Sequence, residues 1–173
     1  MKKIFIILTS LILLTSCGNA EKPFTKSEEE KIVSSLNRDF DMKALIKIGD
    51  IAAEADVNRT KEGTGTVKIT NPKNLSGLTF SFDKNDVTVS FLGLNLKLNN
   101  NDVLNSSLAK ALISSINKAA TPHGVNLSAK GDVITAVGNT ESGDFSLFID
   151  RNKKTILSLS IPDLLLECNF YPS

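Results

Sequence analysis

The side chains that could perform chemistry are few, and none stands in a catalytic or metal-binding pattern. The chain of 173 residues holds two cysteines and one histidine, and it contains no CxxC, HExxH, phosphate-binding loop or nucleophile elbow. His123 stands between Pro122 and Gly124. A single loop histidine cannot form a zinc site or a catalytic triad without partners. We therefore expect no enzyme activity, no metal and no cofactor.

The acidic residues outside the helices occur singly. Asp83, Asp86, Asp132 and Asp150 each lie beside an expected turn. Aspartate is common in turns because its side chain hydrogen-bonds to nearby backbone N–H groups. Turn formation is therefore the favoured interpretation of these residues, and calcium binding or carboxylate catalysis is the minor alternative.

Cys17 is the exception, because it follows a targeting signal. Lys2 and Lys3 precede an apolar run from Ile4 to Leu14, and a basic start before a short apolar core is typical of a secretory signal peptide. The run is shorter than the roughly 20 residues that a membrane-spanning helix needs. The four residues Leu-Thr-Ser-Cys that end at Cys17 resemble the lipobox of bacterial lipoproteins.

The lipobox resemblance implies that a signal peptidase cleaves before Cys17 and that the sulfur carries a diacylglyceryl group, with acyl chains such as palmitate. Two long chains hold a protein on a membrane, whereas one is marginal. Residues 1–16 are then the signal peptide, 17–26 a lipidated tether, and 27–173 a single domain on the extracytoplasmic face of the cell membrane. An ordinary signal peptide with a coincidental cysteine is the alternative.

The charge of the mature chain is nearly balanced. Removal of residues 1–16 leaves 157 residues, with 18 basic and 19 acidic side chains. This length suits one domain with a full core, and the absence of a basic block argues against nucleic acid as a partner. Cys168 then has no cysteine left with which to form an intrachain disulfide. It lies in phase with Leu164, Leu166 and Phe170, which predicts a buried thiol.

Residues 78–98 carry the clearest fold signal. Three runs of alternating apolar and polar residues are joined by turn residues at 83–86 and by Gly93. This pattern predicts an antiparallel meander with one apolar face and one polar face. After residue 98 the apolar period changes to about 3.6, which predicts a long helix over about 102–119.

The remaining segments complete an α+β fold. A short helix is expected over about 27–36, with Ser27 and Glu30 as a capping box. Alternation predicts strands before the meander and after the long helix, with a loop or wide turn over 139–144. We expect a large curved antiparallel sheet, an incomplete β-barrel of about ten to eleven strands. The short helix is at the N-terminus of the domain, and the longer helix covers the concave face of the sheet.

This order of elements resembles that of the lipoprotein-carrier (LolA-like) superfamily. The local sequences of residues 71–80 and 157–170 also resemble members of this superfamily. The superfamily includes the periplasmic lipoprotein carrier, its outer-membrane receptor and related mycobacterial lipoproteins. The resemblance implies a half-barrel whose helices cover an apolar cavity. Three features depart from it: the carrier is not itself lipidated, its lid arginine cannot be placed here, and tryptophan is absent.

The inward apolar face is the one candidate site. Its predicted role is to bind an acyl chain, a lipid or another amphiphile, since one helix covers only part of so long a sheet. The alternative is a structural or interaction lipoprotein of the cell envelope, with a filled core and a protein partner. The candidate lining residues are Phe80, Phe82, Phe91, Leu94, Leu96, Leu112, Phe145, Leu159 and Phe170.

Overall fold

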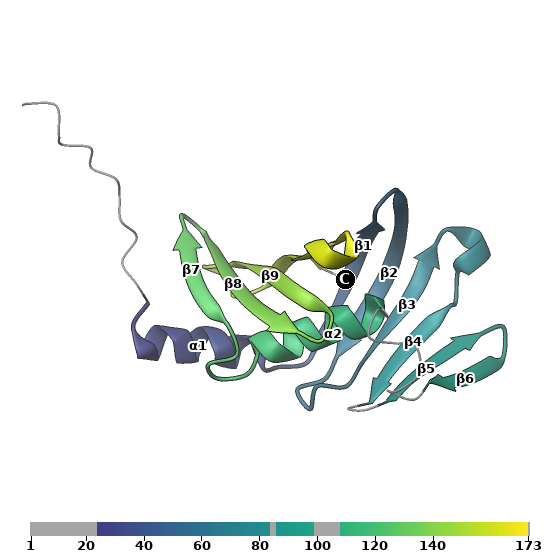
Figure 1. Ribbon diagram of the computed structural model, residues 1–173, viewed down its shortest axis with the longest axis horizontal. Coiled ribbons are helices and arrows are strands. Elements are labelled where there is room, and N and C mark those ends of the chain that lie inside the picture. The colour runs from purple at the N-terminus through teal and green to yellow at the C-terminus, as the bar shows by residue number, and fades with distance from the viewer. Residues whose placement is uncertain (1–23, 84–85, 99–107, 173) are drawn as a thin grey trace, which may run out of the picture.

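The computed structural model describes residues 24–83, 86–98 and 108–172. These residues form two α-helices and eleven strands in one antiparallel sheet (Figure 1). The helices are α1 (Lys26–Leu36) and α2 (Leu108–Ala119), and two short 3-10 turns, η1 (Lys73–Leu75) and η3 (Pro162–Leu164), connect strands. The strands are β1 (Phe40–Ile48), β2 (Ile51–Arg59), β3 (Gly65–Asn71), β4 (Thr79–Asp83), β5 (Asp86–Phe91), β6 (Leu94–Leu98), β7 (Asn126–Lys130), β8 (Val133–Thr140), β9 (Gly143–Asp150), β10 (Ile156–Ile161) and β11 (Leu166–Pro172).

The sheet is open, with β6 and β7 as its two edges. The strand order is β6-β5-β4-β3-β2-β1-β11-β10-β9-β8-β7, so the first and last strands pair at the centre. In the sequence, α2 lies between β6 and β7, and it packs on the inner face of the sheet between the two flanks (Figure 1). The predicted curved α+β half-barrel of ten to eleven strands is confirmed.

The core lies between α2 and the inner face of the sheet. Leu112, Ile113 and Ile116 of α2 are at most 2% exposed, as expected for one apolar stripe on a helix. The facing strands contribute every second residue, such as Phe145, Leu147 and Ile149 of β9. Full burial of each such side chain contributes about 1.5–3 kcal/mol. The hydrophobic effect therefore fixes α2 on β8 and β9.

Two local predictions are wrong. The capping box at the start of α1 uses Thr25 and Glu28, not Ser27 and Glu30: the Glu28 carboxylate accepts from the Thr25 N–H at 2.8 Å. Thr25 already has extended backbone, so the helix begins earlier than predicted. Residues 139–144 are not a loop either, because Thr140 pairs with Gly143 around a two-residue hairpin turn.

Some predictions fall on other parts of the chain. The signal peptide, Cys17 and most of the tether lie outside the described residues, as do residues 102–107 of the predicted long helix. Neither α1 nor α2 is long and apolar enough to cross a membrane.

Candidate functional site

The nine predicted lining residues lie in different parts of the structure. Leu112, Phe145, Leu159 and Phe170 are at most 6% exposed and pack in the closed core around α2. They are therefore core residues, and none of them lines the pocket described below. The other five lie on the inner face of β4, β5 and β6, which α2 leaves partly uncovered.

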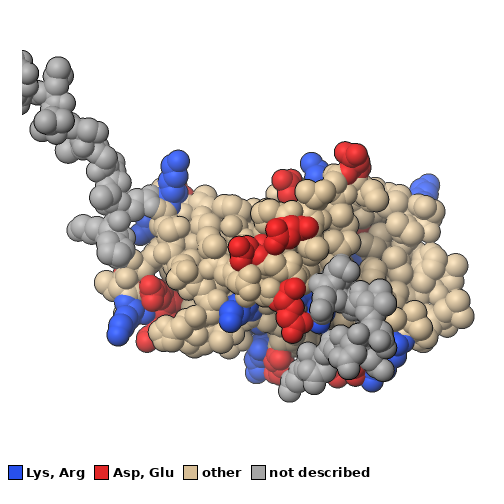
Figure 2. All heavy atoms as spheres, viewed as in Figure 1, with Lys and Arg blue, Asp and Glu red and all other residues tan. Residues whose placement is uncertain are grey.

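The inner face of these three strands carries an apolar surface that is half-buried on β4 and β5 and exposed on β6. The strand register places Phe80 opposite Val89, Val89 opposite Leu96, and Phe91 opposite Leu94. Leu94 and Leu96 are 77% and 60% exposed, and Figure 2 shows few charged side chains at this end of the molecule. We call this surface the open strip; it consists of Phe80, Val89, Phe91, Leu94 and Leu96.

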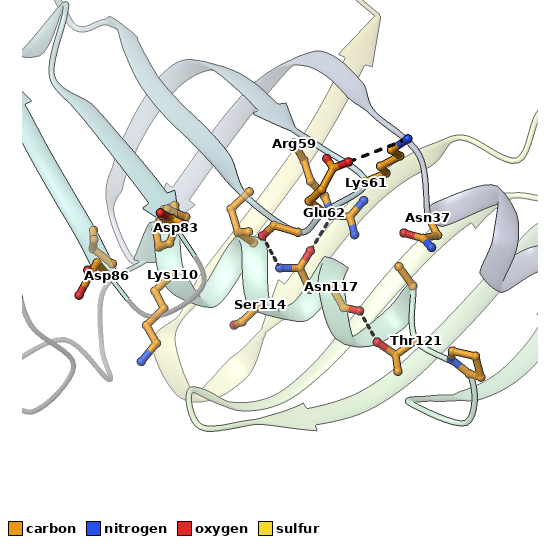
Figure 3. Close-up of a pocket in the computed structure, with 16 residues that line it drawn as sticks. Asn37, Arg59, Lys61, Glu62, Asp83, Asp86, Lys110, Ser114, Asn117 and Thr121 are labelled. Carbon is orange, nitrogen blue, oxygen red and sulfur yellow. Dashed lines mark hydrogen bonds and ion pairs between the residues drawn. The ribbon is translucent and has the colours of Figure 1, made fainter.

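A pocket of about 500 Å³ continues from the open strip. Phe82 and Val87 pair in the next row of the same inner face, and both line the pocket. Successive inward rows lie about 6.7 Å apart along a strand, so the wall runs about 13 Å from Phe82 past Phe80 to Phe91. The complete lining is Asn37, Arg59, Lys61, Glu62, Gly63, Phe82, Asp83, Asp86, Val87, Lys110, Ile113, Ser114, Asn117, Ala120, Thr121 and Pro122 (Figure 3). We call this cavity the Arg59 pocket.

Arg59 is the central polar side chain of this pocket. It is only 2% exposed, and its guanidinium joins three elements. Nε donates to Asn117 Oδ1 at 2.6 Å, and Nη1 donates to the carbonyls of Leu36 and Arg38 at 3.2 and 3.1 Å. These bonds connect the end of β2 with α2 and with the end of α1. Arg59 is therefore a cross-link between the sheet and both helices.

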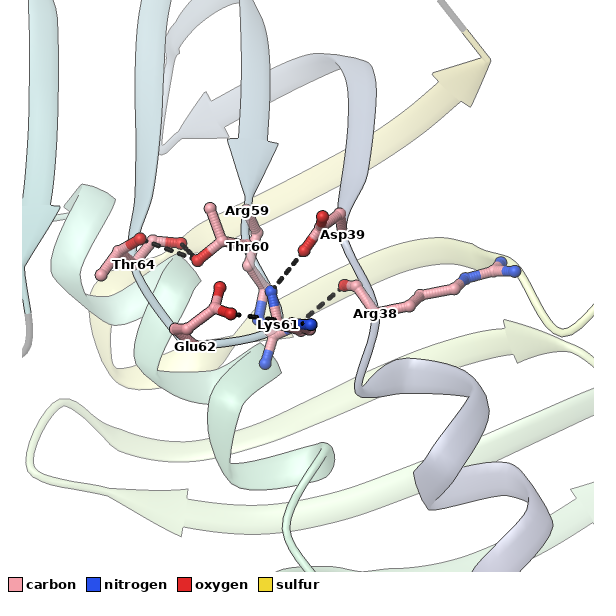
Figure 4. A network of polar contacts seen from close by, with 7 residues as sticks. All are labelled: Arg38, Asp39, Arg59, Thr60, Lys61, Glu62 and Thr64. Carbon is pink, nitrogen blue, oxygen red and sulfur yellow. Dashed lines mark hydrogen bonds and ion pairs between the residues drawn. The ribbon is translucent and has the colours of Figure 1, made fainter.

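Burial lowers the pKa of the Arg59 guanidinium by desolvation, and the negative charge of Asp39 partly opposes this shift. Asp39 is not within ion-pair distance, and its Oδ1 accepts from the Lys61 backbone N–H at 2.6 Å (Figure 4). Asn117 also donates through Nδ2 to the Gly63 carbonyl at 2.8 Å. The β2–β3 hairpin is thereby held against α2.

Sequence reasoning missed Arg59, although one signal was present. Ala55, Val57 and Arg59 follow the same period of two, and all three are buried. A charged residue in the inward phase of a strand needs hydrogen-bond partners, since burying an unpaired charge is unfavourable. That pattern points to a polar site within the concave face.

The other chemical candidates have simple structural surroundings. His123 is exposed and lies on a second pocket of about 550 Å³ between α1 and the end of α2. Asp150 accepts from the Asn152 and Lys153 N–H groups, which lowers the pKa of its carboxyl. Burial raises the pKa of the Cys168 thiol to about 12. Within residues 24–83, 86–98 and 108–172, no three His, Cys, Asp or Glu side chains gather as metal ligands.

Comparisons with known proteins concern the fold. No protein-family model and no curated protein sequence matches the chain. The structure is similar to an uncharacterized conserved protein from Thermus thermophilus, at 11% identity and a TM-score of 0.51, over 86% of this chain and 88% of that one.

Two further solved structures have lower TM-scores. A LolA superfamily protein from Nitrosomonas europaea matches at 12% identity and a TM-score of 0.42, over 86% of this chain and 72% of that one. A chain from the structure of the CwlD amidase from Clostridioides difficile in complex with the GerS lipoprotein matches at 13% identity and a TM-score of 0.41. The match covers 82% of this chain and 88% of that one. At these identities a likeness is one of fold alone. With its open antiparallel sheet and the helix across its concave face, the chain has the half-barrel fold that the resemblance predicted.

Proposed function

We propose that this protein is a membrane-anchored, non-enzymatic lipoprotein that binds the apolar chain of an amphiphile on its concave face. Cys17 carries the lipid anchor in this proposal, after removal of residues 1–16, and residues 17–26 are the tether on the extracytoplasmic face. The observation that supports ligand binding is the open strip, which lies beside a pocket of about 500 Å³.

α2 covers only part of the concave face. Its buried side chains fill the space over β8, β9, β3 and part of β4, where the core is closed. On β6, Leu94 and Leu96 remain largely exposed to water. Removing apolar surface from water contributes about 25 cal/mol per Å², and contiguous exposed apolar surface marks interaction sites. An acyl chain that lies along the open strip would remove this apolar surface from water.

Native mass spectrometry tests the proposal. The full chain is refolded without detergent and offered dodecyl maltoside below its micelle concentration. We expect the wild type to acquire the amphiphile and Leu94→Glu to lose most of this binding, because a carboxylate then lies on the strip. Ile51→Glu is the matched control, since Ile51 is 68% exposed at the β1–β2 hairpin. No acquired amphiphile, or equal loss in both variants, contradicts the proposal.

A second candidate function is recognition of a protein partner along β6. β6 pairs with β5 on one side and is an edge strand of the sheet that the described residues form, and an exposed edge can add a strand from another chain. Leu92 and Gly93 form a two-residue turn with positive φ, so Phe91 and Leu94 are a hydrogen-bonded pair. The N–H of Asn95 therefore points to the free edge.

A pull-down with the anchored protein distinguishes this second function. Asn95→Pro removes an outward donor and leaves the open strip in place. Stoichiometric capture of a partner that Asn95→Pro abolishes, together with unchanged dodecyl maltoside binding, favours strand addition. Capture that Asn95→Pro leaves unchanged counts against it.

A further inference from the structure

Arg59 carries a buried charge that the described residues only partly satisfy. Its Nε and Nη1 atoms donate to Asn117 and to two backbone carbonyls, all neutral acceptors. Its Nη2 makes no hydrogen bond to any described residue, and no described carboxylate lies within 4.0 Å of the guanidinium. Because buried charges are normally paired, the remaining face of the guanidinium is suited to a ligand.

The carboxylates near the pocket are held by other cations or lie elsewhere along its wall. Glu62 pairs with Lys61 at 3.9 Å, and Asp86 pairs with Lys97 at 2.7 Å. Asp83 and Asp86 lie at the β4–β5 end, whereas Arg59 lies where β2 meets α2 (Figure 3). Among the described residues, no carboxylate that lines the pocket is therefore paired with the Arg59 guanidinium.

We propose that the Arg59 pocket binds an oxyanion, a phosphate or a carboxylate, and that this group is the head group of the amphiphile. The planar guanidinium fork matches both groups, since it donates two parallel N–H bonds to their oxygens. The assignment of the anion to an amphiphile rests on the proposed function. A soluble phosphate or carboxylate has the same chemistry, and the experiment below separates the two sources.

The position of the pocket fits a head group. Phe82 and Val87 line the pocket, and they are also the first row of the wall that continues into the open strip. An amphiphile with its anionic group at Arg59 therefore places its chain over Phe80 and then Phe91. Burial of the guanidinium already opposes its charged form, as the direction of its pKa shift shows. A bound anion compensates this desolvation.

Ser114 offers a variant that tests the site without removing Arg59. Its side chain lines the pocket on α2, one helical turn before Asn117, and it is half-buried. Ser114→Glu adds a carboxylate that competes with an anionic ligand, and Ser114→Gln is the neutral control of nearly equal size. Binding of dodecyl phosphate, dodecyl maltoside and inorganic phosphate to the full chain is measured by calorimetry, below the micelle concentrations.

We expect the wild type and Ser114→Gln to bind dodecyl phosphate at least ~10-fold more tightly than dodecyl maltoside, because charge-assisted hydrogen bonds are the stronger ones. Ser114→Glu should remove this difference, whereas Ser114→Gln, which is of nearly equal size, should keep it. Equal affinity for the two amphiphiles in the wild type overturns the anion site and leaves the proposed function standing.

Two further outcomes separate the anion site from the proposed function. Binding of inorganic phosphate that Ser114→Glu abolishes, without a gain from the dodecyl chain, supports the anion site for a soluble anion and counts against the amphiphile. Binding of none of the three compounds overturns the anion site and the proposed function together. Dodecyl phosphate binding that Ser114→Glu and Ser114→Gln reduce equally overturns the assignment of the head group to this pocket.

Discussion

Replacing Arg59 by methionine should destabilise the fold by about 3 kcal/mol, because the side chain joins β2 to both helices. Arg59→Met keeps the length and apolar stem of the side chain but removes three donors. The acceptors left without them are Asn117 Oδ1 and the carbonyls of Leu36 and Arg38. At about 1.5 kcal/mol each, hydrogen bonds from a charged donor amount here to roughly 4.5 kcal/mol. The variant no longer has to bury a charged group, and this gain offsets roughly a third of the lost hydrogen-bond energy.

The assay is equilibrium unfolding in urea, followed by far-UV circular dichroism because the chain has no tryptophan. Arg59→Lys is the matched control: it keeps the charge, but one ammonium cannot reach all three acceptors, so we expect a loss of about 1–2 kcal/mol. A double-mutant cycle with Asn117→Ala should give a coupling energy above ~0.5 kcal/mol. Wild-type stability of Arg59→Met, or no coupling to Asn117, refutes the cross-link.

Three further predictions concern single side chains. Ser115→Ala should raise the free energy of unfolding by about 1 kcal/mol, because the Ser115 hydroxyl is buried without a partner among the described residues and alanine favours the helix; a loss of stability in the same urea assay contradicts this. Hydrogen bonds from Thr25 lower the pKa of the Glu28 carboxyl below 4.5, so its contribution to stability is present above pH 4.5 and is lost as the pH falls through the folded pKa. Thr25→Ala should raise that pKa in an NMR titration, and an unchanged value rules out the capping box. The Cys168 thiol, with a pKa of about 12 and no exposed surface, should not react with a disulfide reagent at pH 8 until the protein unfolds, and rapid labelling of the folded protein contradicts its burial.

The elements of the fold could be predicted because periodicity reports burial directly. Alternation along residues 40–48 and 78–98 indicated the strands, and the change to a period of 3.6 indicated α2. The errors came where two local patterns compete. Thr25 and Ser27 both precede an acidic residue at the spacing of a capping box, and only the backbone conformation distinguishes them.

The candidate site could be predicted only in part, because burial by another element does not appear in a strand pattern. Phe145 and Leu94 both alternate with polar residues, yet Phe145 lies beneath α2 and Leu94 is 77% exposed. The difference depends on where the connection from β6 to β7 crosses the sheet. The partners of Arg59 are equally non-local, since Leu36 and Asn117 lie 23 and 58 residues away in the sequence.

The most direct test of amphiphile binding is to map where an apolar chain lies. The full chain is incubated with a fatty acid that carries a photoreactive diazirine, irradiated, digested and analysed by mass spectrometry. We predict that the cross-links fall on peptides from residues 79–98, around Phe80, Leu94 and Leu96, and that Leu94→Glu reduces them. Cross-links that spread over α1 and the outer face of the sheet, or none above the level of a denatured control, contradict the proposed function.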